Sequence, residues 1–227
     1  MTWIVLFVAI VRVVGIGWGL PASDGWDNDG VAPRDFLPGL AETFTPGAYY
    51  TYPPVHLAIL AVLTLPVTLV AFLRAPSHAL ADVVHEIIKV PYMTSIAYVA
   101  RGVSLLMSLG IVVFVARIAE EIRAHELGVT IAGVREKDKD PRVLHVKWCT
   151  AALVGVNASL TYYAHTTNLD VPYLFWGTWA LLVLVRALAR KEPRLFRRAF
   201  ALAVLAIGTK DQAYAMFLLA IPVAVAY

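Results

Sequence analysis

The sequence predicts an all-α fold: a polytopic bundle of transmembrane helices with a large first extracytoplasmic loop that contains juxtamembrane helices. The first observation is composition. Of 227 residues, 59% are hydrophobic and 15% are charged, whereas a soluble domain is about 45–50% apolar and about 25% charged. The second is that the apolar residues gather in runs long enough to cross a bilayer as helices. The third is that seven and six of the 19 Lys and Arg residues fall in two short stretches, 117–147 and 186–198.

The first apolar run, residues 3–20, predicts a transmembrane helix over 1–20. A cleavable signal peptide is the competing interpretation, because the run is short and small residues follow it. We favour the span, since no base precedes the run and its only charge, Arg12, lies inside it. The later apolar runs occupy residues 52–73, 96–116, 148–166, 171–185 and, with an interruption at Thr209-Lys210-Asp211, 199–227.

The two basic stretches set the expected topology. Lys and Arg near the ends of a span resist translocation, so residues 117–147 and 186–198 should face the cytoplasm. Two apolar runs lie between them, which predicts spans over 148–166 and 171–185 that are joined outside at Asn168-Leu169-Asp170. The span before them, expected over 101–116, should then run inward, with Arg101 near its outer end.

The run over residues 52–73 leaves two topologies open. If it crosses the membrane, the acidic loop after the first span faces the cytoplasm; if it lies in the interface or re-enters, that loop faces outside. We favour the second, because three prolines disfavour regular helix and residues 78–89 have the apolar spacing of a surface helix. It predicts one extracytoplasmic segment over 21–100, irregular over 21–54. The chain ends inside an apolar run, so we expect a piece, or a small member, of a larger protein.

The acidic loop carries the first candidate site. Asp24, Asp27 and Asp29 lie within six residues of each other. A carboxylate can accept a proton from an attacking hydroxyl or bind a divalent cation, so these three are the catalytic candidates. An Asp/Gly turn explains any one of them alone, and their spacing does not fit an EF-hand. If a divalent cation binds, Asp27, Asp29 and Asp170 are the expected ligands; no other cofactor is predicted.

Five more residues are candidate substrate-binding groups. Asp170 is expected on the same side of the membrane as the acidic loop. Lys210 lies in an apolar run, where ionisable residues mark functional sites, although a break between two helices explains it equally well. Arg101 could pair with a phosphate or extend to the water interface. Tyr52 and His56 open an apolar run, and an interfacial aromatic belt is sufficient to explain the tyrosine.

Charge and cysteine content exclude two classes of protein. The net charge of +3 is small, and the basic stretches are expected near anionic lipid, so nucleic acid is not a predicted partner. The single cysteine, Cys149, excludes an internal disulfide framework. The expected location is therefore a cell's inner or plasma membrane, crossed several times.

The short motifs of this chain, in their order along the sequence, resemble the N-terminal half of the GT-C membrane glycosyltransferases, most of all the protein O-mannosyltransferase and aminoarabinose-transferase group. The likeness covers nearly all of the chain, and each motif in it is short. The family has an Asp-Glu pair after its first span, where this chain has Asp27-Asn28-Asp29. The other elements are Tyr52-Pro53-Pro54-Val55-His56, Arg101-Gly102-Val103-Ser104, Asp170-Val171-Pro172 and Gly208-Thr209-Lys210.

The resemblance implies an integral membrane glycosyltransferase that transfers a sugar, with inversion, from a polyprenyl-phosphate-linked donor to an acceptor hydroxyl on the extracytoplasmic side. Asp27 or Asp29 would be the base, and Arg101, Lys210 or a metal would compensate the charge of the leaving phosphate. The expected partners are that donor, membrane lipids and an acceptor protein, lipid or glycan. Two other classes stay open: a transporter or channel subunit, in which Lys210 and Asp211 would line a path, and a non-catalytic membrane scaffold.

Overall fold

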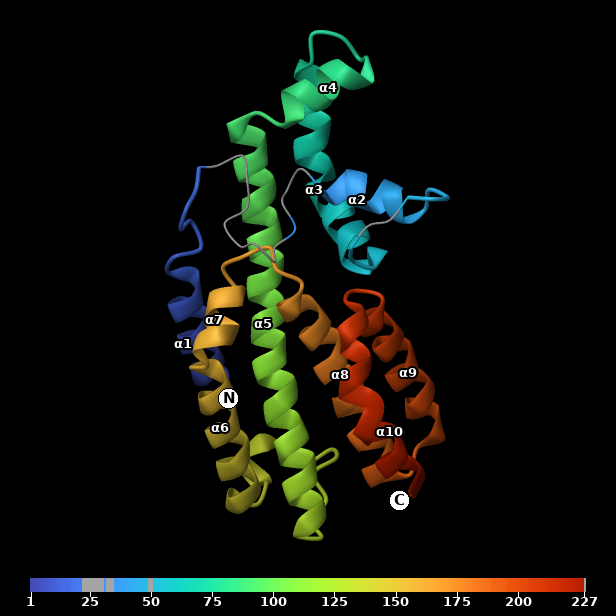
Figure 1. Ribbon diagram of the computed structural model, residues 1–227. Coiled ribbons are helices and arrows are strands. Elements are labelled where there is room, and N and C mark those ends of the chain that lie inside the picture. Colours follow the sequence, from blue (N-terminus) through green and yellow to red (C-terminus); the bar gives the residue numbers. More distant parts are fainter. Residues whose placement is uncertain (22–30, 32–34, 49–50, 227) are drawn as a thin grey trace.

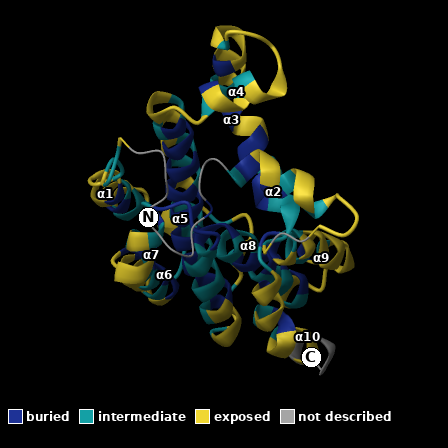
Figure 2. Ribbon diagram, turned by 45° about the horizontal axis from the view of Figure 1, so that its top comes forward, coloured by how far each residue is buried: buried dark blue, intermediate teal, exposed yellow. Residues whose placement is uncertain are grey.

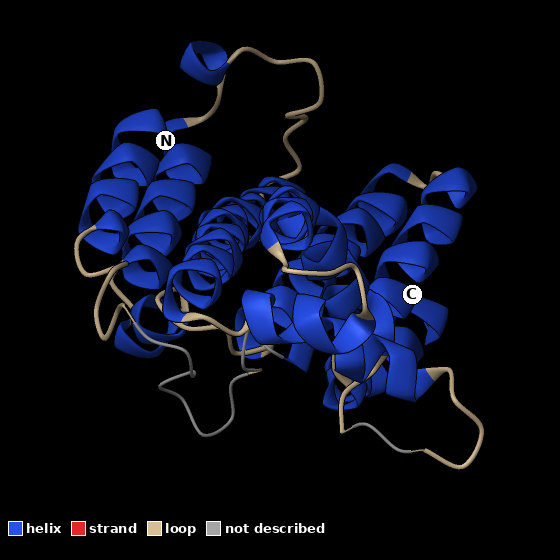
Figure 3. Cartoon of the chain, turned by 90° about the horizontal axis from the view of Figure 1, so that it is seen from above, coloured by secondary structure: helices blue, strands red, loops and turns tan. Residues whose placement is uncertain are grey.

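The computed structural model describes residues 1–21, 31, 35–48 and 51–226. Within these residues the secondary-structure elements are all helices (Figures 1 and 3). This confirms the all-α prediction. Three helices are long and apolar enough to cross a membrane, judged by length and composition: α3 (Pro54–Arg74), α5 (Val90–Glu126) and α8 (Asp170–Arg190). They are compatible with insertion into a membrane, as the composition predicts.

The remaining elements are shorter. They are α1 (Thr2–Val13), α2 (Phe36–Thr43), α4 (Leu80–Ile87), α6 (Pro141–Gly155), α7 (Ala158–Tyr163), α9 (Pro193–Ile207), α10 (Phe217–Ala226) and the 3₁₀ turns η2 (Glu136–Asp138) and η3 (Asp211–Met216). The helix α5 is the central element in Figure 1, with α1, α6 and α7 along one side and α8, α9 and α10 along the other. Its 37 residues correspond to about 55 Å, so it is longer than the hydrocarbon core of a bilayer, about 30 Å.

The core follows this arrangement. One cluster of buried apolar residues joins α1 to α5, α6, α7 and α8; a second joins α2 and α3 to the N-terminal half of α5; a third joins α8 to α9, η3 and α10. Buried residues accordingly concentrate along α5, while α4 presents much exposed surface (Figure 2). The exposed side chains of α3 and α1 are themselves largely apolar, which is expected of helices that meet lipid rather than water.

The first helix is shorter than the predicted 1–20 span. Residues 14–19 form turns, and Gly15 adopts φ = +89°, a left-handed conformation that favours glycine. Arg12, inside the helix, is fully buried, and its guanidinium donates a hydrogen bond of 3.2 Å to the carbonyl oxygen of Gly155. Because the last carbonyls of a helix have no partner within it, Arg12 satisfies the C-terminal end of α6. The ring of His165 in turn contacts the carbonyl oxygen of Arg12.

Three further expectations are corrected. The 52–73 run is a regular helix that continues through Pro66, although the prolines favoured irregular structure. The 148–166 run is not one helix, because α6 ends at Gly155 and Asn157 caps α7, its Oδ1 accepting from the backbone N–H of Leu160 at 2.8 Å. The irregular 21–54 segment contains α2. The expected helices over 101–116 and 171–185 belong to the longer α5 and α8, whereas the amphipathic 78–89 stretch does contain a helix, α4.

The expected basic loop over 117–147 begins and ends as helix and is closed by buried ion pairs. Glu120, on α5, accepts from Lys139 at 2.7 Å, from Arg117 at 2.9 Å and from Lys147 at 3.3 Å. Lys147 is 0% exposed and also contacts Glu136 at 2.8 Å. Burial raises the pKa of Glu136, but the hydrogen bonds and charge of Lys147 outweigh it and place the pKa below its ordinary value. This network joins α5, η2 and α6.

Candidate functional site

The structure brings Asp170 and Lys210 into direct contact. Asp170 is the first residue of α8, and its backbone N–H donates to Asn168 Oδ1 at 2.7 Å. Lys210 follows α9 in extended conformation, and its Nζ donates to Asp170 Oδ1 at 2.6 Å. The ammonium also lies 5.7 Å from the ring centroid of Tyr173, a distance at which a cation is attracted to an aromatic face.

The pair keeps Lys210 charged. Burial lowers the pKa of its ammonium, but the hydrogen bond and the charge of Asp170 outweigh burial, so the pKa of Lys210 is raised above its ordinary value. Tyr52 acts in the same direction, which means that the residues just before α3 lie near the pair. Lys210 therefore remains protonated at neutral pH and forms an ion pair with Asp170.

The start of α3 contacts the end of α9 through its backbone. The N–H of Val55 donates to the carbonyl oxygen of Gly208 at 2.9 Å. A Cβ at Gly208 would lie 2.7 Å from Val55 Cγ2, so only glycine permits this approach. Two of the sequence motifs, the Tyr52-Pro53 element and the Gly208–Lys210 element, are thus adjacent in space. His56, the next residue, is 1% exposed and packs into the core, and among the described residues it forms no hydrogen bond with Asp170 or Lys210.

Arg101 contacts the backbone, so phosphate binding is not needed to explain it. Its side chain is buried, and NH1 donates to the carbonyl oxygens of Ile16 at 2.8 Å and Trp18 at 2.7 Å. These carbonyls belong to the turns that follow α1. Arg101 therefore stabilises the point at which the chain leaves α1 toward the acidic residues.

Replacing Arg101 with methionine should destabilise this turn. Hydrogen bonds from a charged donor contribute about 1.5–3 kcal/mol each, and unpaired buried carbonyls add to the cost, so thermal unfolding in detergent should shift by several degrees. Lysine should restore only part of the loss, because one ammonium lacks the planar fork of a guanidinium. An Arg101→Met protein with unchanged thermal stability would contradict this role. Arg74, at the end of α3, provides a matched control, Arg74→Met.

The catalytic candidates Asp24, Asp27 and Asp29 lie outside the described residues, but the chain on either side of them is described. On the C-terminal side, Val31 is buried and its carbonyl oxygen accepts from Thr167 Oγ1 at 2.6 Å. Thr167 is three residues before Asp170. The segment that carries the acidic residues is therefore connected, at its far end, to the loop that positions Asp170.

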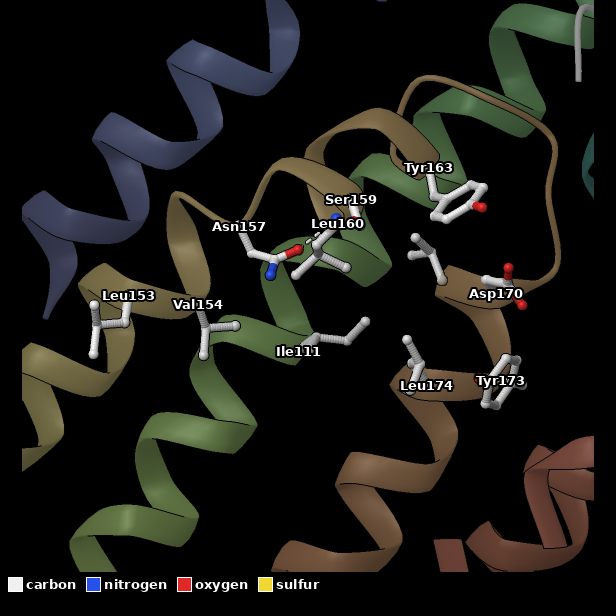
Figure 4. A pocket seen from close by; sticks show the side chains of 11 residues that line it. Ile111, Leu153, Val154, Asn157, Ser159, Leu160, Tyr163, Asp170, Tyr173 and Leu174 are labelled. Carbon is white, nitrogen blue, oxygen red and sulfur yellow. Dashed lines mark hydrogen bonds between the residues drawn. The ribbon is translucent and has the colours of Figure 1, made fainter. Parts of the chain in front are cut away.

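An apolar pocket of about 490 Å³ opens beside Asp170, between α6–α7 and α8 and above α5 (Figure 4). Figure 4 shows Asp170, Tyr173 and Tyr163 at one end, with Leu153 and Val154 toward the other. The complete lining is Ile111, Leu153, Val154, Asn157, Ser159, Leu160, Tyr163, Asp170, Val171, Tyr173 and Leu174. A long apolar chain with a polar or charged head would fit such a lining, its head beside Asp170.

Two residues of the site were not predicted from the sequence. They are Thr167, which donates to the carbonyl oxygen of Val31, and Tyr173, whose ring lies beside the ammonium of Lys210. Tyr173 lies three residues after Asp170, and this spacing puts both on one side of a helix, so it could have been found. Thr167 carries no comparable signal. In the described part of the chain, no three His, Cys, Asp or Glu side chains converge as metal ligands. Asp170 contacts Lys210, and the other two expected ligands, Asp27 and Asp29, lie outside the described residues.

Comparison with known proteins returned no matching family model, no similar curated protein and no similar solved structure.

Proposed function

We propose that this chain is an integral membrane glycosyltransferase, or a part of one, which transfers a sugar from a polyprenyl-phosphate-linked donor to an acceptor hydroxyl on the extracytoplasmic side. The observation that carries the proposal is the Lys210–Asp170 pair at one end of an apolar pocket. Asp170 lines this pocket and holds the ammonium of Lys210 beside it. An apolar lining for the lipid chain and a nearby ammonium that can exchange its carboxylate partner for a phosphate are the two properties that a lipid-linked phosphate requires of its site.

The spatial relation of the sequence motifs adds support. The elements at Tyr52, Asp170 and Lys210 are far apart in the sequence but adjacent in space, and the end of the acidic segment is hydrogen-bonded to Thr167, next to them. Motifs that are separated in the sequence are expected to lie together in space if their residues act on one substrate. It is not required by the membrane-span pattern.

The proposed reaction assigns one role to each group. Asp27 or Asp29 accepts the proton of the acceptor hydroxyl, and the oxygen of that hydroxyl forms the new bond to the anomeric carbon with inversion. The bond between that carbon and the phosphate oxygen breaks, and the electron pair leaves with the lipid phosphate. Lys210 stabilises the negative charge that develops on this phosphate. Asp170 holds the ammonium of Lys210 in position until the phosphate arrives.

Substitution of Lys210 tests this assignment. Removing a group that stabilises transition-state charge reduces rates by roughly 100- to 1,000-fold, so Lys210→Gln should lower transfer from a short-chain polyprenyl-phosphate sugar by about 100-fold, measured in proteoliposomes. Lys210→Arg, which keeps the charge, should retain more activity than Lys210→Gln.

Lys89→Gln is the matched control, because Lys89 is a half-exposed lysine paired with Glu86 on α4, away from the pocket. It should leave transfer unchanged. Equal transfer rates for Lys210→Gln and the unmodified chain would refute the role of the ammonium.

A further inference from the structure

The ammonium of Lys210 lies between two partners that both belong to α8. Its Nζ donates to Asp170 Oδ1 at 2.6 Å, and it lies 5.7 Å from the centroid of the Tyr173 ring. Asp170 and Tyr173 are three residues apart, so they project from the same side of the helix. The side chain of Lys210 is 13% exposed, so little water is available to replace a partner that moves away.

The same two partners form part of the wall of the apolar pocket beside Asp170. Asp170 and Tyr173 both line this pocket (Figure 4), whereas Lys210 is not among its lining residues. An anionic group in the pocket therefore meets the carboxylate and the ring before it meets the ammonium. Because adjacent anions repel each other, the anion binds the ammonium only as the carboxylate of Asp170 gives it up.

The ring of Tyr173 is not displaced by the same event. It carries no net charge that would repel an anion, and it attracts the ammonium through its face. This contact uses none of the three N–H donors of the ammonium, so they stay available to the anion. The ring also packs against the buried cluster that joins α8 to α9, η3 and α10, which keeps it in place when the carboxylate moves.

We propose that Tyr173 is a positioning residue whose ring holds the ammonium of Lys210 beside the pocket while Asp170 releases it to the phosphate of the donor. This role rests on the proposed function, because the glycosyl donor supplies the phosphate. Tyr173 touches no reacting atom and acts through Lys210. The aromatic face supplies the contact and the phenol hydroxyl does not, so phenylalanine should serve in its place and leucine should not.

The Asp170→Asn variant reproduces the release of the ammonium without a donor. The lysines of the purified chain are dimethylated with isotope-labelled formaldehyde, which keeps their charge, and Lys210 is identified as the NMR signal missing from Lys210→Arg. Protons over an aromatic face are shifted upfield. The Lys210 signal should keep an upfield shift in Asp170→Asn and in Tyr173→Phe. In Tyr173→Leu it should move to the range of exposed lysines such as Lys191.

Farnesyl phosphate, which has the lipid phosphate without a sugar, tests the same step with its anion. The Lys210 signal should respond to it and still keep the upfield shift. In proteoliposomes, Tyr173→Leu should lower kcat/KM for sugar transfer by about 3- to 30-fold, the range of a cation–π contact, and Tyr173→Phe should retain most of the rate. Tyr162→Leu is the matched control, because Tyr162 is an exposed tyrosine outside this pocket; it should change neither the signal nor the rate.

Failure of the positioning role and failure of the proposed function give different results. The positioning role is overturned if Tyr173→Leu keeps the upfield shift of Lys210, if Asp170→Asn or farnesyl phosphate abolishes that shift, or if Tyr173→Leu transfers sugar as fast as the unmodified chain. Asp170→Asn retains the ring, so it decides the question even where Tyr173→Leu does not fold. If the shifts behave as expected and the unmodified chain transfers no sugar, the ring holds the ammonium and glycosyl transfer is wrong.

Discussion

The double variant Asp27→Asn/Asp29→Asn should lose sugar transfer by roughly 100- to 10,000-fold, the range that a positioned general base contributes. Asparagine has nearly the shape of aspartate but cannot accept the acceptor proton. The measurement is initial-rate transfer in proteoliposomes from a polyprenyl-phosphate sugar, at saturating donor. One of the single variants should show nearly the whole loss, and this identifies the base.

Asp35→Asn is a suitable control, because Asp35 lies after the acidic cluster and directly precedes α2. It should leave the rate unchanged. The two single variants, the double variant and Asp35→Asn should all insert into the membrane and unfold at the same temperature as the unmodified chain. A loss of transfer can then be attributed to chemistry. Full transfer by the double variant would rule out both carboxylates as the base.

Glu120→Leu should produce the largest loss of stability, about 3–5 kcal/mol, the cost of removing one partner from a buried ion pair. Lys147 is fully buried and Lys139 is 6% exposed at its side chain, so both would lose a close acidic partner where water cannot replace it. Glu136 remains within reach of both lysines and sets the lower end of the range. Thermal unfolding in detergent measures the change.

Two variants bracket this expectation. Glu120→Leu/Lys147→Met replaces acid and base with apolar groups and should recover part of the loss, because it removes the fully buried ammonium of Lys147, while Lys139 keeps its pair with Glu136 at 3.8 Å. Arg135→Ala removes an exposed pair with Asp138 and should change stability by less than about 1 kcal/mol. If Glu120→Leu were no more destabilising than Arg135→Ala, the buried network would not stabilise the fold.

The sequence was sufficient for features that depend on local pattern. Helical class, the helix near 78–89 and the break at Lys210 all follow from hydrophobic spacing and isolated charges. It failed where distant parts of the chain decide. The 52–73 run was expected to lie in the interface or to re-enter, because its prolines disfavour regular helix, yet α3 continues through Pro66 and is long and apolar enough to cross a membrane. Packing against α5 and α2 stabilises a helix that local propensity disfavours.

The site shows the same division. Asp170 and Lys210 were each identified from position, one at a hairpin tip and one in an apolar run. Their contact across 40 residues could not be predicted, because nothing in the spacing fixes how α8 and α9 are paired. Arg101 was expected to pair with a phosphate or to extend to the interface; in the structure its Nη1 donates to the carbonyls of Ile16 and Trp18. Every residue has a backbone carbonyl, so the residue types in a sequence do not show which carbonyls will accept a hydrogen bond from a distant side chain.

The guanidinium of Arg12 has a consequence for the order in which the protein is assembled during synthesis. Its hydrogen-bond acceptor, the carbonyl of Gly155, is 143 residues further along the chain, so that carbonyl is synthesised well after α1. A buried guanidinium without acceptors is costly, so α1 should reach its final packing only after α6 has been made.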